Sequence, residues 1–124
     1  MPPKKSSPED LLPLTPAVFH ILLALADQDR HGYAIMLHVS STTEGQMQLG
    51  PGTLYGTIKR LLAATLIEES GERPDSDIDD ERRRYYRLTE HGRRVLQLEV
   101  QRLASLVKAA RASGVWTGGS APAT

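Results

Sequence analysis

The chain has 124 residues, 40% of them hydrophobic, with no cysteine and with 15 basic and 15 acidic side chains. This length and composition predict one soluble domain, and the longest apolar run, residues 21–26, is far shorter than the roughly 20 residues of a membrane span. The lack of cysteine excludes disulfides, thiolate zinc sites and cysteine nucleophiles, and it fits a reducing cytoplasm.

The zero net charge is the sum of two opposite halves. Residues 1–80 carry 6 basic and 12 acidic side chains, a balance of −6, whereas residues 81–124 carry 9 and 3, a balance of +6. The basic segment suits an anionic partner, and it equally suits pairing with the acidic residues of the same chain. Charge alone therefore does not select a function.

Both ends of the chain are polar, and we expect residues 1–10 to form a flexible arm and residues 113–124 a disordered tail. Between them, Thr15 and Pro16 predict a helix start, because a threonine hydroxyl caps free amides and proline suits the first helical position. This helix should reach about Ala26, with an inner face of Val18, Ile21, Leu22 and Leu25. After a turn over residues 27–30, a second helix is predicted from Gly32 to about Thr43, with an inner face of Tyr33, Met36, Leu37 and Ser40.

A third helix is predicted from the Gly50-Pro51-Gly52-Thr53 segment to about Ala64. On a helical wheel its buried stripe consists of Leu54, Ile58, Leu61, Leu62 and Thr65. The opposite arc has small residues in its middle with cations, hydroxyls and an aromatic ring around them: Thr53, Tyr55, Gly56, Lys59, Arg60 and Ala63. A partner surface can therefore approach this face closely.

A two-stranded hairpin and a long helix complete the predicted elements. The strands should lie within residues 66–70 and 82–88, joined by a loop at residues 71–81 that contains four aspartates. Thr89 then caps a helix from Glu90 to about Ala112. This helix has a coiled-coil-like seam with alternating spacings of four and three: Leu96, Val100, Leu103, Val107 and Ala110. Such a seam favours pairing with another helix.

This order of elements predicts a mainly α fold with a small two-stranded β wing, a winged helix-turn-helix over residues 11–88, followed by a dimerisation helix over residues 89–112. In such a fold the third helix enters the DNA major groove, which is about 12 Å wide and admits one helix. The free amides at the start of that helix, around Gly52 and Thr53, would favour a phosphate.

The sequence resembles the PadR-type transcriptional regulators of bacteria, in their short form with a single C-terminal helix. Four stretches at matching separations carry the resemblance: Leu14-Thr15-Pro16-Ala17, His31-Gly32-Tyr33-Ala34-Ile35, Gly50-Pro51-Gly52-Thr53-Leu54-Tyr55, and Arg84-Tyr85-Tyr86-Arg87-Leu88-Thr89, which leads through Gly92 into the last helix. The resemblance implies a homodimer, held by the C-terminal helices, that binds a pseudo-palindromic operator in double-stranded DNA and most often represses the adjacent gene. It also implies a small-molecule effector near the dimer interface, as in many members of the family.

The resemblance assigns DNA contacts to the start and outer face of the third helix: Gly52, Thr53, Tyr55, Lys59 and Arg60. Two departures modify this picture. Residues 68–81 contain eight acidic side chains in fourteen, so phosphates would repel the wing tip, and Arg82, Arg83 and Arg84 become the candidate wing contacts. Trp116, the only tryptophan, lies in the tail rather than on the last helix, which does not favour a flat aromatic effector.

Each assignment has an alternative within the fold. Tyr55 lies at the edge of the buried stripe, where packing is as well supported as DNA contact. Lys59 and Arg60 are also typical of a solvated helix face, and the three wing arginines of residues 82–84 are also placed to pair with residues 75–81. The acidic loop and the zero net charge leave open a second function, a winged-helix protein-interaction module that does not bind DNA.

Catalysis, cofactors and metals are not expected. The sequence has no nucleophile beside a base, no paired-carboxylate site, and no phosphate-binding glycine loop. Asp75, Asp77 and Asp79 match the start of a calcium loop, but Asp80 and Tyr86 occupy the positions that require glycine and glutamate. His31 is expected to cap or order the start of the second helix.

Overall fold

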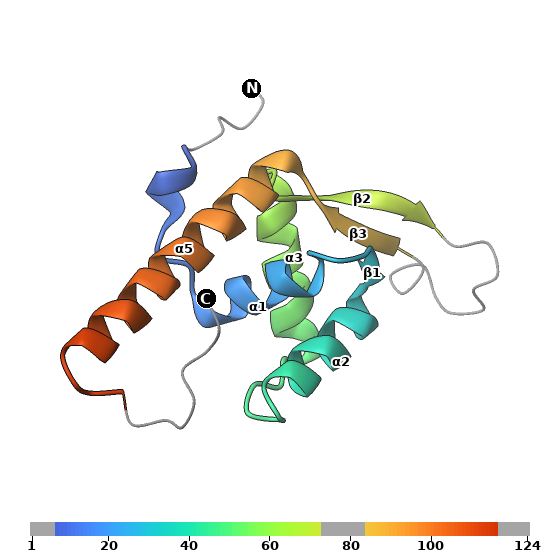
Figure 1. Ribbon diagram of the computed structural model, residues 1–124. Helices are drawn as coiled ribbons and strands as arrows, with labels where there is room; N and C mark the ends of the chain where they lie inside the picture. Colours follow the sequence, from blue (N-terminus) through green and yellow to red (C-terminus); the bar gives the residue numbers. More distant parts are fainter. Residues whose placement is uncertain (1–6, 73–83, 117–124) are drawn as a thin grey trace.

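The computed structural model describes residues 7–72 and 84–116. The described residues form a 3₁₀ helix, η1, together with four α-helices and three strands that Figure 1 labels. Their bounds, in chain order, are η1 Pro8–Leu11, α1 Pro16–Ala24, β1 Arg30–His31, α2 Gly32–Thr42, α3 Pro51–Ala63, β2 Ile67–Glu72, β3 Arg84–Leu88 and α5 Glu90–Ala112. The predicted fold class, mainly α with a small β wing, is confirmed.

Side-chain caps explain where three of the helices begin. The Thr15 Oγ1 accepts a hydrogen bond from the Val18 amide at 3.3 Å, and the Thr89 Oγ1 accepts one from the Gly92 amide at 2.9 Å. The expected role of His31 is also confirmed, because its Nδ1 accepts from the Ala34 amide at 3.1 Å. Each bond satisfies an amide that the first helical turn leaves without a partner.

The sheet is antiparallel with the order β1-β3-β2. Strand β3 pairs with β2 in a register that places Ile67 opposite Leu88, with an irregularity between Glu69 and Gly71. The structure adds the short strand β1, which pairs with β3 and lies partly where a turn over residues 27–30 was predicted. Two residues are too few for a periodic signal, so this strand depends on its neighbour rather than on its own sequence.

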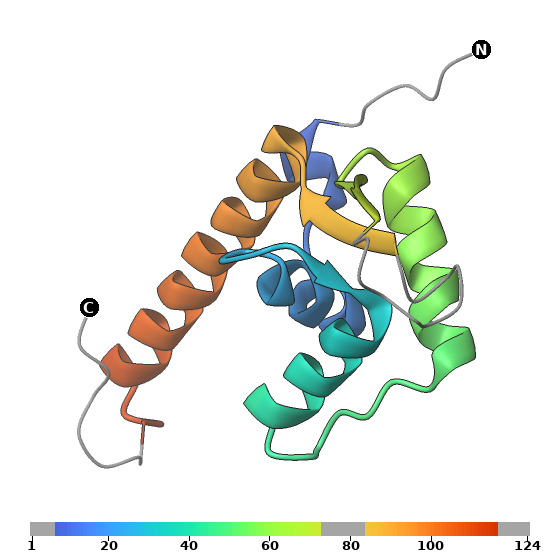
Figure 2. The ribbon, with the colours of Figure 1, turned by 90° about the vertical axis from the view of Figure 1, so that its right-hand side faces the viewer.

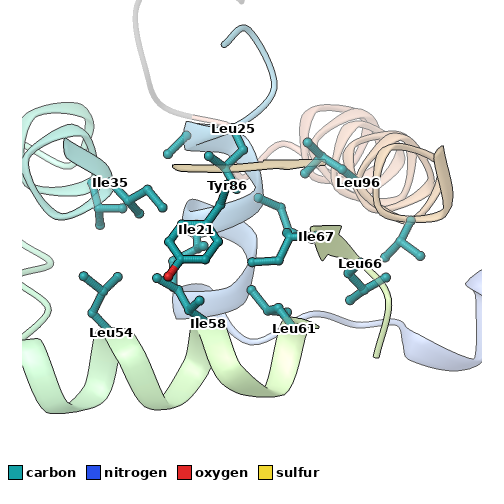
Figure 3. Close-up of a cluster of buried hydrophobic side chains, with 14 residues drawn as sticks. Ile21, Leu25, Ile35, Leu54, Ile58, Leu61, Leu66, Ile67, Tyr86 and Leu96 are labelled. Carbon is teal, nitrogen blue, oxygen red and sulfur yellow. The ribbon is translucent and has the colours of Figure 1, made fainter. Parts of the chain in front are cut away.

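The core lies where α1 meets the wing and the other helices, and Figure 3 shows these side chains together. Its members come from α1, α2, α3, the wing and the first turns of α5, and they include Ile21, Leu22, Ile35, Leu54, Ile58, Ile67, Tyr86 and Val95. Figure 2 shows α3 at one edge of the domain, with its outer side turned away from α1 and α5. That edge position leaves one whole face of α3 accessible.

The predicted inner face of α2 is wrong. The buried residues are Gly32, Ile35 and Val39, whereas Tyr33 and Leu37 are half exposed, Met36 packs only partly against the core, and Ser40 is intermediate. The helix has apolar residues on two sides, so helical periodicity alone did not distinguish them. On α3 the sequence prediction missed one buried side chain, Thr57, and it assigned to the stripe Thr65, which lies beyond the helix at a φ of +60°.

The ends of the chain differ in how far the structure describes them. Pro8–Leu11, which include the last three residues of the predicted arm, form η1, and η1 packs against α5. Residues 1–6 and 117–124 lie outside the described part, as do residues 73–83, which follow β2 and precede β3 in the chain. Trp116 lies beyond the end of α5, as expected. In the described residues, no helix combines the length and the apolar character that crossing a membrane requires.

Candidate nucleic-acid interface

The outward face of α3 is the candidate interface, and the structure exposes it. Gly52, Thr53, Lys59 and Arg60 are all exposed, and within the described part of the chain Lys59 has no ion-pair partner. A Cβ atom added at Gly52 or at Gly56 would meet nothing within 4 Å. The middle of this face is therefore slim, as predicted, with hydroxyl and cationic groups beside it.

Tyr55 is placed differently from the other candidate residues on α3. It is partly buried and packs against the core. A Cβ atom built on Gly32 would lie 2.5 Å from the Tyr55 Oη and 2.7 Å from its Cζ, so the ring tip lies directly over the start of α2. Packing between α2 and α3 accounts for this position, and contact of the hydroxyl with DNA stays a prediction.

A buried polar side chain supports Arg60. Thr57 is only 2% exposed, and its hydroxyl donates to the Thr53 carbonyl oxygen at 2.8 Å. The same Oγ1 accepts a hydrogen bond from Arg60 Nη2 at 3.1 Å. Arg60 is thus exposed but tied to its own helix. The helical wheel did not indicate this contact, because it assigned Thr57 neither to the buried stripe nor to the opposite arc.

The two described arginines of the wing, Arg84 and Arg87, are paired across its strands. Arg87 Nε lies 3.0 Å from Glu68 Oε1, and Arg84 Nη1 lies 3.9 Å from Glu69 Oε1. All four side chains are about half exposed, so each pair contributes little to stability, about 0–1 kcal/mol. Arg84 is therefore paired with Glu69 of β2, and its predicted pairing with residues 75–81 stays a prediction. Arg82 and Arg83, and the acidic residues 75–81, lie outside the described residues.

The predicted seam of α5 divides into two parts. Leu96 is 5% exposed and packs in the core of its own domain. Val100, Leu103 and Val107 are 46%, 36% and 38% exposed, and Ala110 is intermediate. Leu106, which is outside the seam, is 54% exposed and widens the apolar surface. Figure 1 shows this C-terminal half of α5 extending beyond the rest of the domain.

Glu99 is a buried charge on α5 that the sequence prediction missed. Its carboxylate is 2% exposed, it accepts from the Leu14 amide at 2.8 Å, and it receives Arg102 Nε at 2.5 Å and Nη2 at 3.2 Å. The hydrogen bond from Arg102, with that from Leu14, lowers the pKa of Glu99 against the opposing effect of burial. The sequence shows that Glu99 and Arg102 are three residues apart, a spacing at which helical side chains can pair, but it does not show that Glu99 is buried. The contact ties α5 to the segment that precedes α1.

The described residues contain no group of three or more histidine or acidic side chains that could hold a metal ion. The aspartates at positions 75, 77 and 79 lie outside the described residues. His31, the cap of α2, stacks on Tyr33 with 6.5 Å between ring centroids.

Comparisons with known proteins find a matching family model and two similar proteins. The family model for the transcriptional regulator PadR-like family matches residues 21–98. A 37.1 kDa protein in transposon TN4556 of Streptomyces fradiae is 37% identical over 86 residues, which are 69% of this chain and 22% of that protein. Protein X of Lysinibacillus sphaericus is 32% identical over 87 residues, which are 69% of this chain and 76% of that protein.

The three-dimensional fold of this chain is also similar to that of a solved structure. The crystal structure of a PadR family transcription regulator from Clostridium difficile has a TM-score of 0.63 and 26% sequence identity to this chain. The alignment covers 77% of this chain and 94% of that regulator.

Proposed function

Because this chain belongs to the PadR-like family of transcriptional regulators, we propose that it is a homodimeric DNA-binding repressor that recognises a pseudo-palindromic operator beside the gene it controls. The observation that carries the proposal is the exposed, slim and cationic outer face of α3. By the same family resemblance, a small molecule bound near the dimer interface relieves repression.

The outer face of α3 suits the major groove in shape and charge. Gly52 and Gly56 have no side chain, so the helix can approach the base edges in a groove about 12 Å wide. Lys59 can then contact a phosphate and Arg60 a phosphate or guanine, and the exposed Thr53 lies about two helical turns earlier. The first amides of α3 have no side-chain cap and face a region where a phosphate would be favoured.

The exposed stripe of α5 supports the homodimer. Val100, Leu103 and Val107 continue the apolar side of the helix past the end of the domain core. A second copy of the same helix would remove this surface from water, which is favourable by about 25 cal/mol for each Å² buried. A dimer would present two α3 helices, and two half-sites of an operator lie about 34–36 Å apart along one helical turn.

The proposal can be tested with the full chain and a duplex covering the DNA upstream of its own gene. The logarithm of affinity should fall steeply with the logarithm of salt concentration, because phosphate contacts release counterions. Lys59→Ala should weaken binding and reduce the magnitude of that slope by about 1, while Lys108→Ala on α5 serves as the matched loss of an exposed lysine. Equal binding by Lys59→Ala and the wild type would refute the assignment of α3.

The cross-strand pairs of the wing favour the second candidate, a protein-interaction module. Glu68 and Glu69 neutralise Arg87 and Arg84, so the described wing offers phosphates little net positive charge. If this module has lost DNA binding, affinity for the duplex will be absent or independent of salt. The salt titration above therefore separates the two functions.

A further inference from the structure

We propose that Thr57 is a positioning residue that holds Arg60 in place for DNA recognition. The inference rests on the proposed function and adds to it a residue that does not itself touch DNA. Thr57 lies on the buried side of α3, with 2% of its surface exposed, among Leu54, Ile58 and Leu61.

The hydroxyl of Thr57 both donates and accepts a hydrogen bond. It donates its single proton to the Thr53 carbonyl oxygen at 2.8 Å, so a lone pair remains to accept from Arg60 Nη2 at 3.1 Å. The first bond fixes the orientation of the hydroxyl, and that orientation determines where the Arg60 guanidinium is held. Arg60 contributes only one of its five N–H groups to this contact, so four remain for a ligand.

The apolar neighbours of Thr57 do not require a hydroxyl at this position. Valine has nearly the same shape, and a threonine that bonds back to its own helix slightly weakens and bends that helix. The hydroxyl of Thr57 bonds to one backbone group, the Thr53 carbonyl oxygen, and to one side chain, the guanidinium of Arg60. Arg60 is therefore the side chain that the hydroxyl can hold in place. A long arginine otherwise loses rotamer freedom when it binds DNA, and a contact formed beforehand reduces that loss.

A double-mutant cycle tests this inference on the intact protein. The wild type, Thr57→Val, Arg60→Ala and the double variant are titrated against the upstream duplex at one salt concentration. Thr57→Val should weaken binding by about two- to tenfold in the wild-type background and should have no further effect beside Arg60→Ala. Thr57→Ser, which keeps the hydroxyl, should restore affinity close to that of the wild type.

Two further measurements separate positioning from folding. The melting temperature of Thr57→Val should be no lower than that of Thr57→Ser, because the valine keeps the buried methyl group. In the protein without DNA, the NMR order parameter of the Arg60 Nε–Hε group should fall in Thr57→Val and not in Thr57→Ser.

The outcomes distinguish this inference from the function on which it rests. A wild-type protein that does not bind the duplex overturns both. A wild type that binds with the expected salt dependence, together with equal losses from Thr57→Val in both backgrounds, overturns the positioning role alone. The same conclusion follows if Thr57→Ser binds as weakly as Thr57→Val.

Discussion

Gly92 provides the sharpest test of how the domain is assembled. It lies in the first turn of α5, where the helix contacts the turn between α3 and β2. A Cβ atom at this position would lie 1.9 Å from the Leu66 carbonyl oxygen and 2.8 Å from the Leu66 carbonyl carbon. Both atoms belong to the backbone and cannot rotate away as a side chain would. Gly92→Ala must therefore move the start of α5 away from this turn.

The size of the effect follows from what that movement breaks. The Thr89 amide donates to the Leu66 carbonyl oxygen at 3.2 Å, and the Thr89 hydroxyl donates to the Thr65 carbonyl oxygen at 2.6 Å. Overpacking costs about 1–3 kcal/mol, and each lost hydrogen bond costs about 0.5–1.5 kcal/mol. Alanine recovers about 1 kcal/mol of helix propensity. The free energy of unfolding should therefore fall by about 1–5 kcal/mol.

Gly56 offers a matched control on α3. It is also a glycine inside a helix, but a Cβ atom there meets nothing within 4 Å. Gly56→Ala should therefore raise the free energy of unfolding by up to about 1 kcal/mol. Both variants are measured by urea denaturation with far-UV circular dichroism at one protein concentration, since dimerisation would make stability depend on concentration. If Gly92→Ala is as stable as Gly56→Ala, the close contact at Leu66 is refuted.

Two other predictions concern α5. Leu103→Asp should convert the dimer to a monomer, because a carboxylate would lie in the middle of the apolar stripe. Gln101→Asp, on the exposed opposite side of the helix, should remain dimeric. Sedimentation or light scattering that finds both variants dimeric would exclude this interface. The pKa of Glu99 is lower in the folded protein than its ordinary value of 4.5. The ionised Glu99 therefore stabilises the fold at pH values above 4.5, and this stabilisation is lost as the pH falls through the folded-state pKa. The melting temperature of the wild type should therefore fall more steeply below about pH 4.5 than that of Glu99→Gln. Parallel pH profiles of the two melting temperatures would contradict this role.

The parts of the fold that sequence predicted well depend on neighbouring residues alone. The Thr15-Pro16 pair and Thr89 act on the turn that follows them, so the starts of α1 and α5 lie where they were expected. Most of the outer face of α3 was also predicted, because its cations and its main apolar residues lie on different sides of the helix, whereas Tyr55 and Thr57 depart from that pattern. Lys59 and Arg60 are accordingly exposed.

The features that sequence did not predict depend on contacts between distant elements. The inner face of α2 is determined by the core in which Ile35 and Val39 are buried, and the sequence alone did not separate them from the prediction that included Tyr33 and Leu37. Glu99 is buried where it accepts a hydrogen bond from the Leu14 amide, 85 residues away in the chain. In each case the contacts that determine burial come from residues far away in the chain, so a local sequence pattern cannot predict them.

The junction at Gly92 also affects how two copies of the chain would meet an operator. Thr65 and Leu66 directly follow α3, so their contacts with Thr89 and Gly92 hold the end of α3 against the start of α5. In the proposed dimer, the direction of α5 then sets the separation of the two α3 helices, which must match half-sites about 34–36 Å apart. At a temperature where Gly92→Ala is folded, we therefore expect it to lose affinity for the operator more than for unrelated DNA. Lys59→Ala should instead weaken both to a similar extent, because a phosphate contact is independent of base sequence.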